Sequence, residues 1–197
     1  MHKSSYEHMQ DLVSRYLDPK ETLSVVDIGS YDVNGSYRTL FGSRNWSYTG
    51  IDLEAGPGVD VVLKSPYRLP FPSGYFDLVV SGQAFEHVEY FWMSWLEMLR
   101  VLKPGGRIFL IAPSRGPEHR YPQDCWRFYP DGYRALARFG SCELLEVTTD
   151  WEPHPDPGSG PWGDTVGVFR KQPLGLRAKV FQAMMLAANR LQTGAKA

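Results

Sequence analysis

The chain has 197 residues, of which 43% are hydrophobic and 22% charged, and its formal net charge is −1. This length suits one globular domain, so residues 1–197 are expected to fold as a single unit. The small net charge argues against nucleic acid as a partner. No stretch approaches the roughly 20 apolar residues of a membrane span. Two cysteines without metal-ligand spacing favour a cytoplasmic protein over a disulfide-linked one.

The spacing of apolar residues predicts strands that alternate with helices. An amphipathic helix is expected within residues 1–20, where apolar side chains recur at helical spacing. A second helix is expected from Phe91 to Leu102, because proline and glycine at 103–106 break its pattern. Such alternation predicts an α/β domain with a mostly parallel sheet between helices. The other expected elements are strands at 23–29, 46–52, 59–63, 76–81, 107–112, 142–149 and 164–171, and helices at 131–139 and 175–192.

The helix expected at 175–192 carries apolar residues along one side. Basic residues flank this side, and a basic amphipathic helix can lie on a membrane surface. We expect it instead to pack on the core or across a homodimer. The apolar side consists of Leu176, Val180, Ala183, Met184, Ala187 and Leu191.

Two of the expected strands end on an acid. Asp27 and Gly29 follow the first apolar run, and Asp52 follows the second. A glycine lets the backbone approach a ligand, and a carboxylate can accept both hydroxyls of a ribose. A dinucleotide site would need closely spaced glycines for the pyrophosphate, whereas this loop has only Gly29 and Gly35. An NAD-dependent oxidoreductase is therefore disfavoured.

Three runs in fixed order carry a family resemblance: LPFPSGYFDLVVS (69–81), FEHV (85–88) and LEMLRVLKPGGRIFLIAP (96–113). Together they resemble the class I methyltransferases that use S-adenosylmethionine (SAM), in particular their small-molecule branch. The resemblance implies a doubly wound, Rossmann-like sheet of seven strands with an antiparallel last strand at 164–171. It also implies SAM as the cofactor.

The same resemblance implies a set of cofactor contacts. Asp27 and Gly29 would line the methionine end of SAM, Asp52 would hold the ribose, and Gln83 would lie beside the sulfonium. Residue 65, near the adenine, is a serine where the family usually has an acid. The remaining expected cofactor residues are Ser30, Gly35, Leu53, Ser65 and Ser81.

The loop after the first strand departs from the family pattern. Tyr31 and Val33 stand where small residues are common. If Tyr31 filled the cofactor site, the chain would be a catalytically silent binding partner. This alternative stays open from the sequence.

Transfer of a methyl group to a hydroxyl requires a base that removes the proton or a metal that acidifies the hydroxyl. His119 and His87 are the candidate bases, with Glu86 or Asp124 to orient them. Many relatives carry Glu-His at 86–87, so His87 also has a structural reading. Glu86, His119 and Asp124 would suit Mg²⁺ if they converged. His2 and His8 are expected at the surface.

Residues 124–132 contain the pattern D-x-W-R-F-Y-P-D-G. This pattern resembles small methyltransferases encoded among polysaccharide-modifying enzymes, with those that methylate mannose-containing polysaccharides as a closer match. The loops 113–131 and 150–163 would then cover the acceptor. Aromatic side chains could stack on a sugar, and polar ones could bond its hydroxyls. The expected acceptor contacts are Tyr121, Trp126, Arg127 and His154.

A structural reading of the same pattern is that its aromatic residues pin the loop to the core, with Arg127 paired to a carboxylate. We favour this reading for Phe128 and Tyr129. The predicted function is O-methylation of a sugar or oligosaccharide. The alternatives are a natural-product amine or phenol as acceptor, and the silent binding partner.

Overall fold

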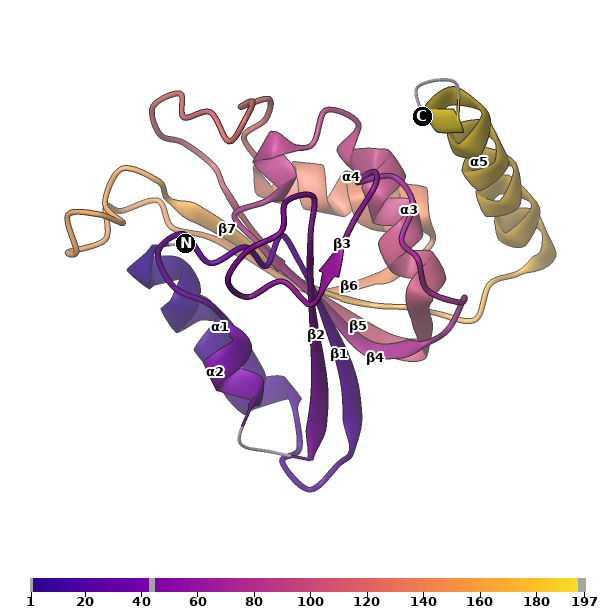
Figure 1. Ribbon diagram of the computed structural model, residues 1–197, viewed down its shortest axis with the longest axis horizontal. Coiled ribbons are helices and arrows are strands. Elements are labelled where there is room, and N and C mark those ends of the chain that lie inside the picture. The colour runs from indigo at the N-terminus through magenta and orange to yellow at the C-terminus, as the bar shows by residue number, and fades with distance from the viewer. Residues whose placement is uncertain (1, 43–44, 195–197) are drawn as a thin grey trace.

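The computed structural model describes residues 2–42 and 45–194. The described strands form one seven-stranded sheet in the order β3-β2-β1-β4-β5-β7-β6, with helices on both faces (Figure 1). The strands are β1 (Leu23–Ile28), β2 (Trp46–Asp52), β3 (Val61–Val62), β4 (Phe76–Gly82), β5 (Leu102–Pro113), β6 (Glu143–Thr149) and β7 (Asp164–Arg170). The helices are α1 (Lys3–Tyr16), α2 (Arg38–Phe41), the short 3₁₀ helix η1 (Phe85–His87), α3 (Phe91–Val101), α4 (Pro130–Gly140) and α5 (Leu176–Gly194).

The sheet is parallel from β3 to β5, and β7 runs antiparallel to both of its neighbours, β5 and β6. This arrangement confirms the predicted α/β class, the seven strands and the antiparallel last strand. Among the described helices, none has the length and apolar character needed to cross a bilayer.

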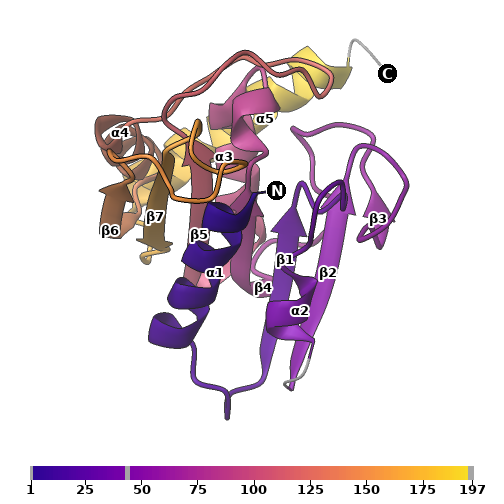
Figure 2. The same ribbon diagram turned by 90° about the vertical axis from the view of Figure 1, so that its left-hand side faces the viewer.

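Each face of the sheet has its own core, because successive residues of a strand point to opposite faces. In β4, Val79 belongs to one core and Val80 to the other. Figure 2 shows α1 and α2 on one face and α3 on the other. The helices contribute Met9, Leu12, Val13 and Phe41 to the core that contains Val80. They contribute Trp95, Met98, Leu99, Tyr133 and Leu136 to the core that contains Val79.

Two strands begin more than one residue away from the predicted position. β3 contains only Val61 and Val62, and it pairs with the end of β2 alone. β5 begins at Leu102, directly after α3, so the proline–glycine stretch ends the helix but lies within the strand. The backbone N–H of Gly105 donates to the Lys171 carbonyl, and Lys171 donates to the Gly106 carbonyl. These bonds keep the stretch in the ladder.

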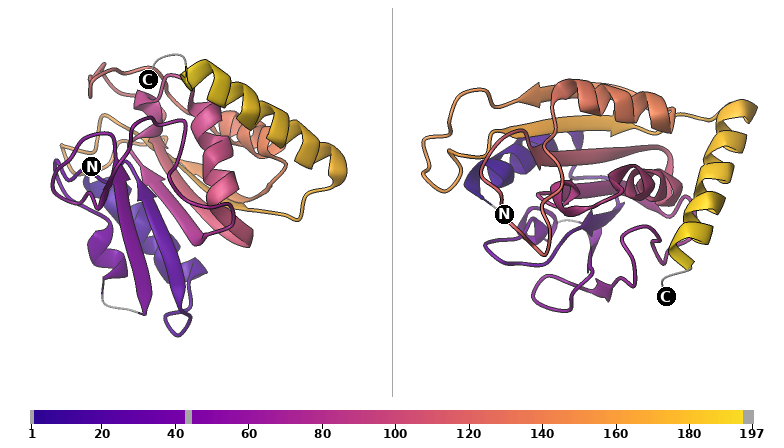
Figure 3. Two further views of the ribbon diagram at one scale, coloured as in Figure 1. Left: turned by 45° about the vertical axis from the view of Figure 1, so that its right-hand side comes forward. Right: turned by 90° about the horizontal axis from the view of Figure 1, so that it is seen from above.

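The expectation that the apolar side of α5 packs on the core is wrong. Leu176, Met184 and Leu191 are 79%, 67% and 80% exposed. The inward face carries Gln182 and Asn189, whose amides donate to the carbonyls of Gly140 (2.7 Å) and Tyr67 (2.9 Å). These two bonds fix the opposite side of the helix against the domain, beside α3 (Figure 3). Packing across a dimer stays a prediction.

Candidate active site

The carboxyl ends of β1, β2 and β4 meet at one edge of the sheet, where the strand order reverses. In open α/β sheets such a switch point is where ligands bind. Three predicted cofactor residues lie there: Gly29 after β1, Asp52 at the end of β2, and Gln83 after β4. The backbone N–H groups of Gly29 and Ser30 both donate to the Ile51 carbonyl, at 3.0 and 3.1 Å, and so tie the first loop to β2.

Gly29 occupies a position that no other residue fits. Its φ is +85°, and a Cβ built on it would lie 2.4 Å from the Cβ of Ala84. Side chains disfavour that φ, and the contact leaves no room for one. The glycine therefore brings the turn after β4, where Gln83 also has a positive φ of 57°, against the turn after β1.

Asp27 is a buried carboxyl group with one unsatisfied oxygen. The Tyr48 hydroxyl donates to Oδ2, whereas Oδ1 has no hydrogen-bond partner within the described part of the chain. Burial raises the pKa of Asp27 to about 7, although the bond from Tyr48 opposes the rise. An unpaired buried acceptor is unfavourable, so a ligand group that donates here would be stabilised. This fits the ammonium group at the methionine end of SAM.

Asp52 and Tyr31 define the next part of the edge. The Asp52 carboxylate accepts the backbone N–H of Tyr31 (3.1 Å) and of Leu53 (2.7 Å). The Tyr31 ring lies against Gly56, where an added Cβ would be 2.2 Å from it, and not against Gly29. The ring therefore covers the loop after β2 and does not fill the turn at Gly29, as the silent binding partner would require.

Two serines predicted to contact the cofactor use their hydroxyl groups in hydrogen bonds within the protein. Ser30 donates to the Gly58 carbonyl at 3.0 Å, and Ser81 donates to the Ile28 carbonyl at 2.9 Å. Both side chains are buried. They hold neighbouring loops in place, so neither hydroxyl is free to donate to a ligand.

The remaining predicted cofactor residues lie around the same loops. Gly35 has a φ of +123°, and its N–H donates to Asp32. Ser65 accepts the N–H of Tyr67 at 3.2 Å, and Leu53 is 45% exposed. A cavity of about 500 Å³ adjoins the first loop and is lined by His2, Lys3, Tyr6, Asp32, Asn34, Gly35, Ser36 and Thr39.

Asp164, which the sequence analysis missed, links the cofactor edge to α1. It is fully buried, and it accepts hydrogen bonds from Gln83 (2.7 Å) and Ser4 (2.7 Å), with His2 Nε2 at 3.4 Å. Burial alone would raise its pKa, but these contacts hold the pKa below its ordinary value. The feature of the sequence that could have identified Asp164 is its position: an acid at the first residue of an expected strand, directly after a Pro/Gly-rich loop.

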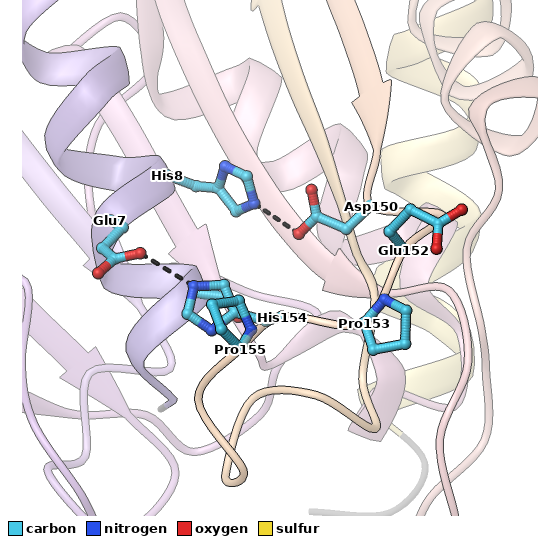
Figure 4. A pocket seen from close by; sticks show the side chains of 8 residues that line it. Glu7, His8, Asp150, Glu152, Pro153, His154 and Pro155 are labelled. Atoms are coloured by element: carbon cyan, nitrogen blue, oxygen red, sulfur yellow. Dashed lines mark hydrogen bonds and ion pairs between the residues drawn. The ribbon is translucent and has the colours of Figure 1, made fainter.

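A second cavity, of about 240 Å³, lies between α1 and residues 150–155 (Figure 4). His8 and Asp150 point toward each other at 2.7 Å, and His154 Nε2 lies 3.1 Å from the Glu7 carboxylate. The surface expectation for His8 is wrong. Burial lowers its pKa, but the contact with Asp150 outweighs burial and the net pKa is raised. The lining is therefore rich in hydrogen-bonding groups.

His2 is also more enclosed than expected. Its side chain is 16% exposed, and its ring stacks on Trp162 with centroids 5.6 Å apart. His2 also borders the larger cavity and contacts Asp164.

Glu86, His87 and His119 converge after β4. One potential ligand atom from each lies within 4.8 Å of the others. His87 Nε2 is 3.6 Å from Glu86, and the two imidazole centroids are 4.7 Å apart. Burial lowers the pKa of both imidazoles and raises that of Glu86 to about 8. Both histidines are thus neutral near pH 7, as a proton acceptor or metal ligand must be.

Asp124 orients His119 but does not join this group. Its Oδ2 accepts the His119 backbone N–H at 2.8 Å and lies 3.3 Å from His119 Nδ1. Both oxygens also accept from the Arg127 guanidinium, at 2.6 and 2.7 Å, and this pairing holds the pKa of Asp124 far below its ordinary value. The three groups proposed from the sequence as metal ligands, Glu86, His119 and Asp124, are not among the convergent sets of the described residues, whereas Glu86, His87 and His119 are.

The aromatic residues of the loop between β5 and α4 have different roles. Trp126 packs edge-on against Phe91, and its indole N–H donates to two backbone carbonyls, so it anchors the loop. Phe128 is buried, as favoured. Tyr129 is 53% exposed and stacks on Trp151, so its predicted core role is wrong. Tyr121 is 63% exposed, with its ring 6.1 Å from His119.

The strand order and the ligand edge define a Rossmann-like methyltransferase fold, and comparison with known proteins agrees. An S-adenosylmethionine-dependent methyltransferase from Mesorhizobium loti superposes with a TM-score of 0.62 at 14% identity, over 83% of this chain and 98% of that one. A Burkholderia thailandensis 1,6-didemethyltoxoflavin N1-methyltransferase, solved with its substrate and S-adenosylhomocysteine, gives 0.62 at 17% identity over 86% and 85%.

Comparison of the sequence with known proteins also finds methyltransferases. Residues 26–110 match the family described as "Methyltransferase domain". An uncharacterized methyltransferase of Mycobacterium sp. strain KMS is 35% identical over 130 residues, 59% of this chain and 49% of that protein. The chain thus spans about half the length of the curated relatives it matches. These matches and the fold make the chain similar to class I, SAM-dependent methyltransferases.

Proposed function

We propose that this protein transfers the methyl group of SAM to a hydroxyl of a sugar or oligosaccharide. The observation that carries the proposal is the position of His119. Its imidazole is oriented by Asp124, borders the exposed ring of Tyr121, and follows the strand edge at which the cofactor residues gather.

We assign each part of SAM to residues at the carboxyl ends of β1, β2 and β4. Asp27 and the turn at Gly29 bind the methionine end, Asp52 accepts hydrogen bonds from the ribose hydroxyls, and Ser65 lies near the adenine. Gln83, fixed by its bond to Asp164, faces the reacting centre. When bound, SAM supplies an electrophilic methyl group on a sulfonium.

The acceptor side consists of the loops 113–131 and 150–163 together with α1. The cavity at residues 150–155 is lined by two histidines and three acids, which suit hydroxyl groups. Exposed Tyr121 and the stacked pair of Tyr129 and Trp151 offer flat apolar surfaces for a sugar ring. His154 lines this cavity. Arg127 and Trp126 hold the loop in shape, so we propose positioning roles for them.

The acceptor hydroxyl gives up its proton at the group formed by Glu86, His87 and His119. Nucleophilic displacement requires the hydroxyl in line with the methyl group, with water excluded. His119 contacts the hydroxyl, Asp124 accepts the His119 backbone N–H, and Trp162 packs on the ring with centroids 4.5 Å apart. The site thereby positions a neutral imidazole next to the reacting atoms.

Replacement of Asp52 by alanine tests the cofactor assignment. Loss of a charge-assisted hydrogen bond is expected to weaken binding of SAM and S-adenosylhomocysteine by about 10- to 100-fold. Isothermal titration calorimetry measures this directly. Asp60→Ala is the matched control, because Asp60 lies nearby and pairs with Arg38 rather than facing the cofactor edge. Equal affinities for the wild type and the Asp52 variant would exclude the assigned ribose contact.

The acceptor class is tested with SAM labelled in its methyl group. Oligosaccharides, amines and phenols are supplied separately, and the labelled product is counted. The proposal expects sugars to be labelled. Label confined to amines or phenols would keep methyl transfer and overturn the sugar assignment. Absence of both transfer and SAM binding would favour a silent binding protein.

A further inference from the structure

The group of Glu86, His87 and His119 has a feature that proton transfer alone does not require. Glu86 is fully buried, and neither of its carboxylate oxygens has a hydrogen-bond partner within the described part of the chain. Its Oε1 faces His87 Nε2 at 3.6 Å, too long for a hydrogen bond. A buried carboxyl group that lies beside two imidazoles with both oxygens unsatisfied is unfavourable, and a bound cation would complete the group.

The surroundings of the two histidines fit ligation of a cation. His87 Nδ1 lies 2.6 Å from the Gln123 carbonyl, which can only accept, so Nδ1 carries the proton and Nε2 presents its lone pair toward Glu86. His119 has the Asp124 carboxylate 3.3 Å from Nδ1. Imidazoles that bind metals typically donate their other N–H to a carbonyl or carboxylate, as His87 does to the Gln123 carbonyl.

The second convergent group among the described residues lacks this feature. His8, Asp150 and Asp164 also lie within 4.8 Å of one another. His8 is paired with Asp150 at 2.7 Å, and Asp164 accepts hydrogen bonds from Gln83 and Ser4. These groups satisfy each other and need no cation.

We propose that Glu86, His87 and His119 bind a divalent transition-metal ion of the Zn²⁺ type. Two imidazoles and one carboxylate suit such ions, whereas Mg²⁺ prefers oxygen ligands. Three protein ligands leave a coordination position open, as in catalytic rather than structural zinc sites. An acceptor hydroxyl at that position would have a lowered pKa, so the ion would take over from the His119 imidazole the task of activating the hydroxyl. The binding claim itself holds whatever the methyl acceptor is.

The test is a metal-binding measurement on the full chain. Protein stripped with a chelator is mixed with ZnCl₂, desalted and analysed for metal by mass spectrometry. The wild type is expected to retain about one Zn²⁺ per chain, as set by the three ligands. Glu86→Gln and His119→Ala are each expected to weaken binding by more than about 10-fold. Circular dichroism confirms that the variants are folded, and Glu86→Gln preserves the shape of the side chain.

His8→Ala is the matched control, because it removes one imidazole from the other convergent group. It is expected to retain zinc like the wild type. The proposal is overturned if the wild type retains no zinc, if Glu86→Gln and His119→Ala both retain it, or if only His8→Ala loses it. S-adenosylhomocysteine binding, measured on the same samples, reports separately on the methyltransferase assignment, so the two proposals fail independently.

Discussion

Replacement of His119 by alanine is expected to lower kcat for methyl transfer by at least about 100-fold, because a positioned group that handles the acceptor proton contributes on that scale. Binding of S-adenosylhomocysteine should stay within about 2-fold of the wild type, a change too small to reflect a lost charge-assisted bond. His119 lies on the loop after β5 and is not among the residues assigned to SAM. Steady-state kinetics with saturating SAM, together with calorimetry, measures both quantities.

Two further variants separate proton handling from acceptor binding. Asp124→Asn is expected to lower kcat by about 10-fold, because it weakens the hydrogen bonds from the His119 backbone and from Arg127 that position His119. His154→Ala, in the cavity at 150–155, is expected to raise KM with a smaller effect on kcat. If His154→Ala lowers kcat as much as His119→Ala does, the assignment of His119 is wrong.

Asp27 is expected to make the free energy of unfolding fall as the pH rises. Its pKa is raised from 3.8 to about 7 in the folded protein by burial. Below about pH 4 the carboxyl is protonated in both states and has no effect, whereas above it the unfolded chain releases the proton and the folded chain retains it. The resulting loss of stability reaches about 4 kcal/mol near pH 7 and is constant above that pH.

Asp27→Asn is therefore expected to flatten this pH dependence and to be more stable than the wild type near pH 7. Urea unfolding of the cofactor-free protein at a series of pH values measures the slope. Asp60→Asn is the matched control, and it is expected to change the pH dependence of the free energy of unfolding in the opposite direction. Burial raises the pKa of Asp60, but its bonds with Gly50 and Arg38 hold the net pKa below its ordinary value, so Asp60 stabilises the protein above that pKa. An unchanged slope in Asp27→Asn would exclude the buried, protonated state of Asp27.

The sheet and the cofactor edge were predictable because their signals are local. Apolar runs that end on Asp27 and Asp52 indicate buried strands with acids at their carboxyl ends. The carboxyl ends of parallel strands then meet at one edge without further information. The family resemblance added the antiparallel last strand, which the observed register confirms.

The acceptor side was predictable only in part, because its contacts join residues far apart in the chain. Gln83 and Asp164 are separated by 81 positions, and His8 and Asp150 by 142. The loop that carries His119 has no periodicity from which its path could be read. Only the folded path of this loop brings the His119 ring beside the His87 ring and lets Arg127 donate to both carboxylate oxygens of Asp124.

The face of α5 illustrates the same limit. Apolar spacing predicted the packed side, but two amides on the other side decided the orientation through bonds to Gly140 and Tyr67. A pattern of hydrophobic residues cannot anticipate such bonds, because their partners lie on other elements.

Structural analysis of the reaction product tests the central claim most directly. The wild-type protein is incubated with SAM carrying a ¹³C methyl group and an oligosaccharide acceptor, and the product is examined by NMR. Our account predicts a labelled methyl ether on one sugar hydroxyl, absent from the His119→Ala reaction. Label on nitrogen or carbon of another acceptor, with none on sugars, would contradict it.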